Sequence, residues 1–221
     1  MQHMNGMLYE NRQHAGQALG KLVAALPEIA GGIVLGLVRG GVPVASEVAR
    51  ECRLPLDIMA VRKLHAPGQR ELAMGAIASG GGVALNQDVL RECHVSEGHL
   101  EQAIEHEKDE MARQESILRQ GRSTPQIAGR TVILVDDGLA TGATMRASIR
   151  SVKQAHAKKV IVAVPVGASS TCDELTAEVD YVACPLKPDW MFAVSQFYAD
   201  FGQTTNEDVR RLLVEAAHAP E

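Results

Sequence analysis

Val-Ile-Leu-Val-Asp-Asp-Gly-Leu-Ala-Thr-Gly-Ala-Thr, residues 132–144, is the stretch that decides the fold of this 221-residue chain. Its four aliphatic residues, Val132 to Val135, are typical of a strand buried on both faces, as in a parallel sheet. A loop rich in glycine and threonine follows, and we expect a helix to begin near Met145. Small residues between a strand and a helix leave backbone N–H groups free at the helix N-terminus, which is a typical anion site.

Two adjacent carboxylates, Asp136 and Asp137, separate the strand from this loop. Alone, they would repel a phosphate. They suit a ligand that also carries hydroxyl groups, or one that is accompanied by a divalent metal. The stretch therefore indicates a site for a sugar phosphate with magnesium.

Strands and helices alternate along the rest of the chain. Aliphatic runs predict strands over 33–38, 55–62, 160–164 and 179–184, and helical spacing predicts helices over 11–25, 43–51, 170–177 and 206–217. The alternation predicts an α/β fold, with a doubly wound, mainly parallel sheet flanked by helices and a small hood or accessory region. Ligands bind such sheets at the carboxyl ends of the strands.

Residues 63–72 have turn chemistry and mixed charge, which predicts a mobile loop. Short strands are expected over 75–79 and 83–85, and a long charged helix over 96–120. We expect one domain over 1–221, with a long helical insertion at about 88–121 and an aromatic-rich C-terminal segment at 181–217.

Composition favours a soluble cytoplasmic protein. The net charge is −5 and no long basic run is present, which argues against a nucleic-acid partner. The four cysteines are far apart and form no Cys-x-x-Cys pair, so neither a disulfide framework nor a zinc site is indicated. Pro27, Glu28 and two glycines interrupt the apolar stretch 22–38, which excludes it as a membrane span.

The 132–144 motif has neither the Gly-Lys-[Ser/Thr] of a Walker loop nor the Gly-x-Gly-x-x-Gly of a Rossmann turn. It closely resembles the phosphoribosyl pyrophosphate (PRPP) signature of type I phosphoribosyltransferases: four hydrophobic residues, two acids, a variable pair, then small-Thr-Gly-x-Thr. The resemblance implies that Asp136 and Asp137 hold the ribose hydroxyls, while the loop holds the 5′-phosphate. The substrate-binding residues of the loop are then Gly138, Ala140, Thr141, Gly142, Ala143 and Thr144. An ordinary strand–helix connection with a surface acid pair is the alternative.

The turn Arg39-Gly40-Gly41 follows the strand expected at 33–38. It resembles the pyrophosphate loop of the same family, whose amides face the leaving group, often through a non-proline cis peptide. Val38 stands where relatives tend to have proline. A plain glycine turn is the alternative.

Arg62 and Lys63 resemble the paired cations of the orotate phosphoribosyltransferases, which meet the pyrophosphate as a loop closes over the site. A solvated strand end is the alternative for both residues. His65 and Arg70 could also reach the diphosphate on closure. Residues 64–70 differ from the family's usual glycine and Asn-Pro pattern.

The acceptor is less well indicated. Relatives that use hypoxanthine or guanine carry an acid at the position of Ala140, so alanine weakens a 6-oxopurine assignment. Six of the seven aromatic residues lie within 181–201. Trp190 and Phe192 are the candidates for an acceptor pocket, while Tyr198 and Phe201 look more like packing residues of a C-terminal minicore.

The resemblance, which is to a bacterial branch of the family, implies Mg²⁺-dependent transfer of phosphoribose from PRPP to a nitrogenous base, with release of pyrophosphate. Asp136 would contact the metal indirectly, through the substrate, and a homodimer is expected. Two alternatives stay open: a non-catalytic regulator that binds PRPP or a nucleotide, and a PRPP hydrolase. The expected catalytic residues are Asp136, Asp137, Arg62, Lys63 and Arg39.

Overall fold

The body of the protein is a five-stranded parallel sheet in the order β2-β1-β6-β7-β8. The computed structural model describes residues 9–218, except for the side chain of Arg70. All residues of β1 and β6 are buried, as the aliphatic run at 132–135 predicted. The predicted doubly wound, mainly parallel sheet is confirmed. The strands are β1 (Ile33–Leu37), β2 (Leu56–Met59), β6 (Thr131–Val135), β7 (Lys159–Ala163) and β8 (Tyr181–Ala183).

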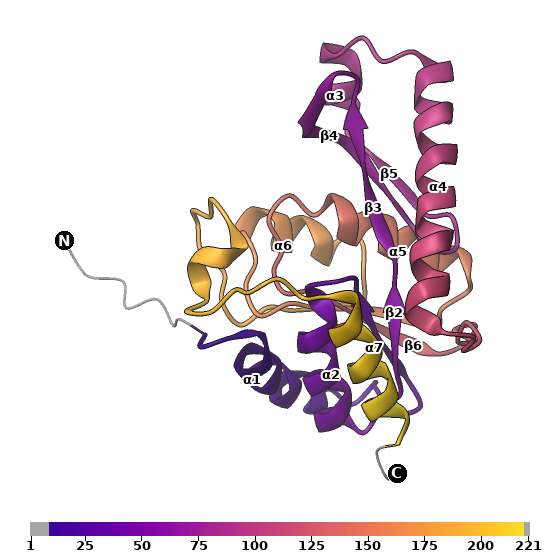
Figure 1. The fold of residues 1–221 in the computed structure, drawn as a ribbon. Helices are drawn as coiled ribbons and strands as arrows, with labels where there is room; N and C mark the ends of the chain where they lie inside the picture. Colours follow the sequence, from indigo (N-terminus) through magenta and orange to yellow (C-terminus); the bar gives the residue numbers. More distant parts are fainter. Residues whose placement is uncertain (1–8, 219–221) are drawn as a thin grey trace, which may run out of the picture.

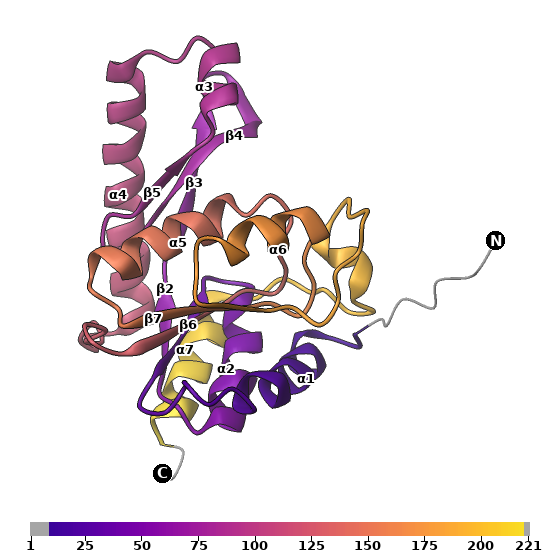
Figure 2. The same cartoon turned by 180° about the vertical axis from the view of Figure 1, so that it is seen from behind.

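Helices cover both faces of this sheet (Figure 1). One face carries α5 (Ala143–Gln154) and α6 (Ser169–Thr176), and the other carries α1 (Arg12–Ala24), α2 (Gly41–Cys52) and α7 (Asn206–Ala217). Side chains of a strand alternate between its faces. Val132 and Leu134 accordingly belong to the apolar core under α5, while Ile133 and Val135 belong to the core under α2. Figure 2, which shows the molecule from behind, gives a clear view of the layer formed by α5 and α6.

A hood rises from the body (Figures 1 and 2). It consists of the antiparallel strands β3 (Val61–Ala66), β4 (Gln69–Ala78) and β5 (Val83–Leu85), with α3 (Gln87–Glu92) and α4 (Glu97–Arg119). Its own apolar core includes Leu64, Met74, Ile77 and Met111. At the foot of α4, Arg119 donates to Asp57 Oδ1 of β2 at 2.5 Å, which fastens the hood to the body.

Two predictions for this region are wrong. Residues 63–72 belong to the β3–β4 hairpin and are strand except at its tip, rather than an irregular loop, because the turn chemistry belongs only to the two residues at the tip, Pro67 and Gly68. The single strand expected over 55–62 is divided between two sheets. The chain leaves the body sheet at Ala60, whose N–H donates to Ser79 Oγ and whose carbonyl accepts from Ser79 N–H.

The strand order reverses between β1 and β6. After β1 the chain adds β2 on one side, and it later returns to add β6 on the other. Ligands of open α/β sheets bind at the carboxyl ends of the strands at such a reversal. The turn after β1 and the loop after β6 lie there. No helix within residues 9–218 is long and apolar enough to cross a membrane.

The packing of β6 predicts a large difference between two identical substitutions. Ile133 is fully buried in β6, whereas Ile117 in α4 is 51% exposed. Ile133→Ala should lower the free energy of unfolding by about 2–5 kcal/mol, because it leaves a cavity in the core. Ile117→Ala should change it by about 0.5 kcal/mol or less. Urea denaturation measures both values, and equal losses would contradict the core assigned to β6.

Candidate functional site

The turn after β1 packs directly against the acid pair after β6. The Val38–Arg39 peptide, which leads into this turn, is cis, as it often is in the pyrophosphate loop that the turn resembles. A Cβ on Gly40 would overlap Asp137 Oδ2, and a Cβ on Gly41 would lie 2.6 Å from the Val135 carbonyl oxygen. Glycine at both positions therefore lets this turn approach the end of β6.

Each carboxylate has one occupied oxygen. Asp136 Oδ1 accepts from the N–H of Asp137 at 2.9 Å. Asp137 Oδ2 accepts from Arg12 Nε at 2.8 Å, and Arg12 Nη2 lies 2.8 Å from the same oxygen. Among residues 9–218, no group donates to Asp136 Oδ2 or to Asp137 Oδ1. Those two oxygens are available to hydroxyl donors of a ligand.

Burial disfavours the state in which both of these acids are ionised. Burial raises the pKa of Asp136 well above its usual range, and the neighbouring charge of Asp137 raises it further. The positive charges of Arg12 and Lys63 act in the opposite direction. The pKa of Asp137 is raised by burial, against which the Arg12 guanidinium acts to lower it. A ligand that donates hydrogen bonds to these acids, or a cation, would stabilise their ionised forms.

The loop after the acids presents free backbone amides. Two hydrogen bonds fix the first part of this loop. Leu139 N–H donates to the Val166 carbonyl at 2.9 Å, and Thr171 Oγ1 donates to the Ala140 carbonyl at 2.7 Å. In the part of the chain that the structure describes, the N–H groups from Ala140 to Met145 donate to no acceptor. Gly142, with φ of 75°, caps α5, which begins two residues before the expected Met145. The arrangement is that of an anion site at a helix N-terminus.

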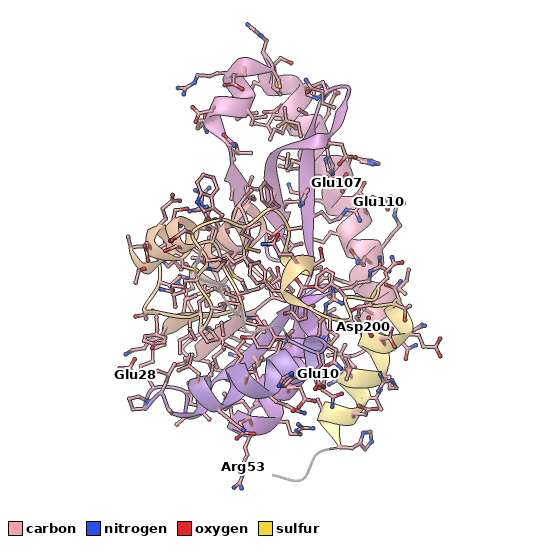
Figure 3. The ribbon with its side chains drawn as sticks, turned by 90° about the vertical axis from the view of Figure 1, so that its left-hand side faces the viewer. Glu10, Glu28, Arg53, Glu107, Glu110 and Asp200 are labelled. Atoms are coloured by element: carbon pink, nitrogen blue, oxygen red, sulfur yellow. The ribbon has the colours of Figure 1, made fainter. Side chains whose placement is uncertain are left out.

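Arg62 and Lys63 point to opposite sides of β3, since neighbouring residues of a strand alternate. Lys63 lies near enough to the acids to lower the pKa of Asp136. Arg62 lies on the α4 side, where its Nε forms an ion pair with Glu107. Figure 3 labels Glu107 on α4, beside the hood strands. Of these two cations, the structure therefore brings Lys63, and not Arg62, towards the acid pair.

The other predicted residues lie farther out. His65 is exposed, and Arg70 lies in β4 with a side chain outside the described part of the protein. Trp190 and Phe192 are 84% and 93% exposed, so no pocket encloses them. They precede the short helix η1 (Val194–Phe197), whose Val194 packs so closely on Gly138 that a Cβ there would overlap it. The segment that carries the two aromatics thus reaches the edge of the acid pair.

Arg12 and Tyr198 are the contacts of Asp137 that sequence analysis missed as site residues. Tyr198 Oη donates to the Asp137 carbonyl at 2.6 Å, and Tyr198 also packs on Tyr9 and Phe201, as its expected packing role implied. The helix that Arg12 begins was predicted over 11–25, and in the structure Asn11 caps it. No sequence pattern connects Arg12 with an acid 125 positions away.

A separate cavity of about 1120 Å³ lies between α1, α2 and α7. Arg12 forms part of its wall, but neither acid lines it. The cavity therefore does not coincide with the site at the end of β6.

Comparison with known proteins agrees with this geometry. The sequence pattern of the phosphoribosyl transferase domain matches residues 10–201. The chain belongs to the phosphoribosyl transferase domain family. The resemblance seen in the 132–144 motif is thereby confirmed at the level of the family, and the parallel sheet agrees with it.

Two relatives within this family come from two strains of Mycobacterium tuberculosis, and both carry the provisional name of a phosphoribosyl transferase. Each is 40% identical over 206 residues, which are 93% of this chain and 46% of the relative. The chain thus spans about half the length of these relatives. The crystal structure of TT1426 from Thermus thermophilus is also 40% identical, with a TM-score of 0.80, over 95% of this chain and 99% of that one.

The buried acid pair predicts a stability gain from neutralising Asp136. Because folding raises the pKa of Asp136, its ionised form destabilises the folded state at neutral pH. Asp136→Asn keeps the oxygen that accepts from Asp137 N–H and removes the charge. The free energy of unfolding at pH 7, measured with urea, should rise by about 1 kcal/mol or more.

This gain should shrink as the pH falls towards the usual aspartate pKa of about 4, where the unfolded chain also becomes protonated. Asp109→Asn on the exposed face of α4 is the control and should change stability little at any pH. A loss of stability in Asp136→Asn at pH 7 would contradict the account of the acid pair.

Proposed function

We propose that the protein catalyses Mg²⁺-dependent transfer of phosphoribose from PRPP to a nitrogenous base or related acceptor, with release of pyrophosphate. One observation supports this proposal above the others. Two carboxylates with free oxygens, a set of free amides and a glycine turn meet at one edge of the sheet. These three parts complement the ribose, the 5′-phosphate and the pyrophosphate of one donor molecule.

Asp136 Oδ2 and Asp137 Oδ1 would accept from the ribose hydroxyls, because no described residue donates to them. The amides from Ala140 to Met145 would donate to the 5′-phosphate at the start of α5. The turn Arg39-Gly40-Gly41 would turn its amides towards the pyrophosphate. Gly40 and Gly41 allow this turn to lie against the acids, so the donor's parts would be held within one small site.

The chemical difficulty of the reaction is charge separation. As the bond from C1 to the pyrophosphate oxygen breaks, the ribose becomes cationic and the leaving group gains negative charge. Asp136 and Asp137 would stabilise the ribose side, and Arg39 and Lys63 the pyrophosphate side. Fixed charges and amides of this kind lower the barrier without reorganising during the reaction.

Magnesium fits the oxygen ligands at the site. Residues 9–218 contain no cluster of three or more His, Cys, Asp or Glu side chains that could hold a metal alone. Mg²⁺ is usually bound through one or two carboxylates together with substrate oxygens and water. Asp136 would make such an indirect contact, and the ion would neutralise pyrophosphate charge.

The acceptor side of the proposal rests on the segment after β8. Trp190 and Phe192 are exposed in this segment, and its Val194 touches Gly138 beside the acids. Aromatic side chains at this place could stack on a planar base. Ala140 supplies no acid for a 6-oxopurine.

Pyrophosphate release tests the reaction directly. Purified protein is incubated with PRPP, Mg²⁺ and each member of a panel of bases. Release that depends on one base is expected. Release without a base would identify a hydrolase, and binding of PRPP without release would identify a binding protein; both results contradict transfer.

Substitution of the proposed ribose-binding acid tests its role in the reaction. Asp137→Asn should lower the rate of pyrophosphate release on the order of 10²–10³-fold, because it removes a charge that stabilises the transition state. Asp109→Asn, on the exposed face of α4, should keep the wild-type rate. Unchanged turnover in Asp137→Asn, with the same fold by circular dichroism, would refute the assigned role.

The Arg62–Glu107 ion pair gives a prediction for PRPP binding. Arg62 can meet the pyrophosphate only after it leaves Glu107, so Glu107 competes with the donor. Glu107→Gln should tighten PRPP binding, measured by calorimetry with Mg²⁺, about 5-fold, as expected for a partly exposed ion pair. Glu110→Gln, one turn farther along α4 and paired with Arg113, is the matched control. Unchanged affinity in Glu107→Gln would assign Arg62 to the packing of the hood alone.

A further inference from the structure

Arg12 makes more contacts at the site than any predicted cation. Two of its guanidinium nitrogens lie 2.8 Å from Asp137 Oδ2, and Nη1 donates to the Gly202 carbonyl at 2.6 Å. Its Cζ lies 3.8 Å from the centre of the Phe201 ring. The side chain is 12% exposed. An arginine with an acid, a carbonyl and an aromatic face as partners has little freedom to move.

Two paired segments, residues 9–10 and 197–200, hold Arg12 in this place. Tyr9 N–H donates to the Phe197 carbonyl at 2.9 Å, and Asp200 N–H donates to the Glu10 carbonyl at 2.8 Å. Figure 3 labels Glu10 and Asp200 where these segments meet. Arg12 is the first residue of α1, directly after this pairing. The backbone is therefore fixed immediately before the arginine.

Asp137 is held at two of its groups by side chains from these paired segments. Its carbonyl accepts from Tyr198 Oη, and its carboxylate accepts from Arg12. Tyr198 packs between Tyr9 and Phe201, with ring centres 5.6 Å and 5.0 Å away. The aromatic cluster near the C-terminus thus supports both groups that hold Asp137.

The geometry distinguishes the two oxygens of the acid. Arg12 binds Oδ2, and Gly40 lies so close to Oδ2 that it leaves no room for a Cβ. Oδ1 has no donor among the described residues and can receive one from a ligand. Two guanidinium nitrogens on one oxygen also restrict rotation of the carboxylate.

We propose that Arg12 is a positioning residue for the donor: it holds Asp137 Oδ2 so that Oδ1 receives a hydroxyl of the ribose. The inference rests on the proposed function and extends it, because it assigns the discrimination of ribose hydroxyls to a residue outside the PRPP motif. Phe201 and Gly202 act through Arg12 and do not touch the donor.

Sugar phosphates with and without the hydroxyls test this role. Dissociation constants are measured with Mg²⁺ for ribose 5-phosphate, for 2,3-dideoxyribose 5-phosphate and for inorganic pyrophosphate, by competition against PRPP. Wild-type protein should prefer the ribose compound. In Arg12→Gln this preference should fall about tenfold, because Asp137 loses a charged hydrogen-bond partner, while the affinity for pyrophosphate stays within about twofold.

Matched variants separate positioning from folding. Arg211→Gln removes an arginine from the same cavity wall, where it pairs with Glu215, and should keep the wild-type preference. Arg12→Lys keeps the charge but cannot place two nitrogens on Oδ2 while a third contacts Gly202, so its preference should be intermediate. Phe201→Leu should lower the preference less than Arg12→Gln and add nothing to it in the double variant.

The outcomes distinguish this inference from the proposed function. A wild-type protein that binds neither PRPP nor ribose 5-phosphate refutes the proposed function itself. A wild-type protein that prefers the ribose compound, together with an equal preference in Arg12→Gln, overturns the positioning role alone. A parallel loss of pyrophosphate affinity in Arg12→Gln also overturns it, because Arg12 would then act on the folding of the whole site.

Discussion

Two neighbouring carboxylates at the buried end of the central strand are the constraint on which the rest of the site depends. Burial disfavours charge on Asp136 and Asp137, and each also repels the other. The surrounding structure compensates for this with the guanidinium of Arg12, the ammonium of Lys63 and the Asp137 N–H that donates to Asp136 Oδ1. The compensation is incomplete, since one oxygen of each acid accepts nothing from the described residues. A ligand that supplies hydroxyls would complete it, so the proposed donor would bind at a site that costs the free protein some stability.

Local patterns were enough to predict the body of the fold and to single out the 132–144 motif. The run at 132–135 is buried on both faces, and the amides from Ala140 to Met145 donate to no acceptor within residues 9–218. Both properties follow from residues that are adjacent in the sequence. The family resemblance indicated the turn at Arg39, and its role as a pyrophosphate loop stays a prediction. The hairpin at 63–72 was missed because its tip has the composition of a loop, whereas the strands on either side of it are defined by pairing with each other.

Contacts between distant segments could not be predicted from the sequence. Arg12 meets Asp137 only because the N-terminal segment pairs with residues 197–200 and α1 begins directly afterwards. Arg62 and Lys63 were treated as one cationic pair, but strand alternation sends Arg62 to Glu107 and Lys63 towards the acids. Predicting that these two side chains point in opposite directions would have required knowing that residue 61 begins a strand of the hood and does not end a strand of the body.

A crystal structure of the protein with PRPP and Mg²⁺ is the most direct test of the central claim. In this structure we expect the ribose hydroxyls on Asp136 Oδ2 and Asp137 Oδ1, with Arg12 still on Asp137 Oδ2. We also expect the 5′-phosphate on the amides at the start of α5. Binding of PRPP in the cavity between α1, α2 and α7, or a ribose that makes no contact with either acid, would contradict the claim.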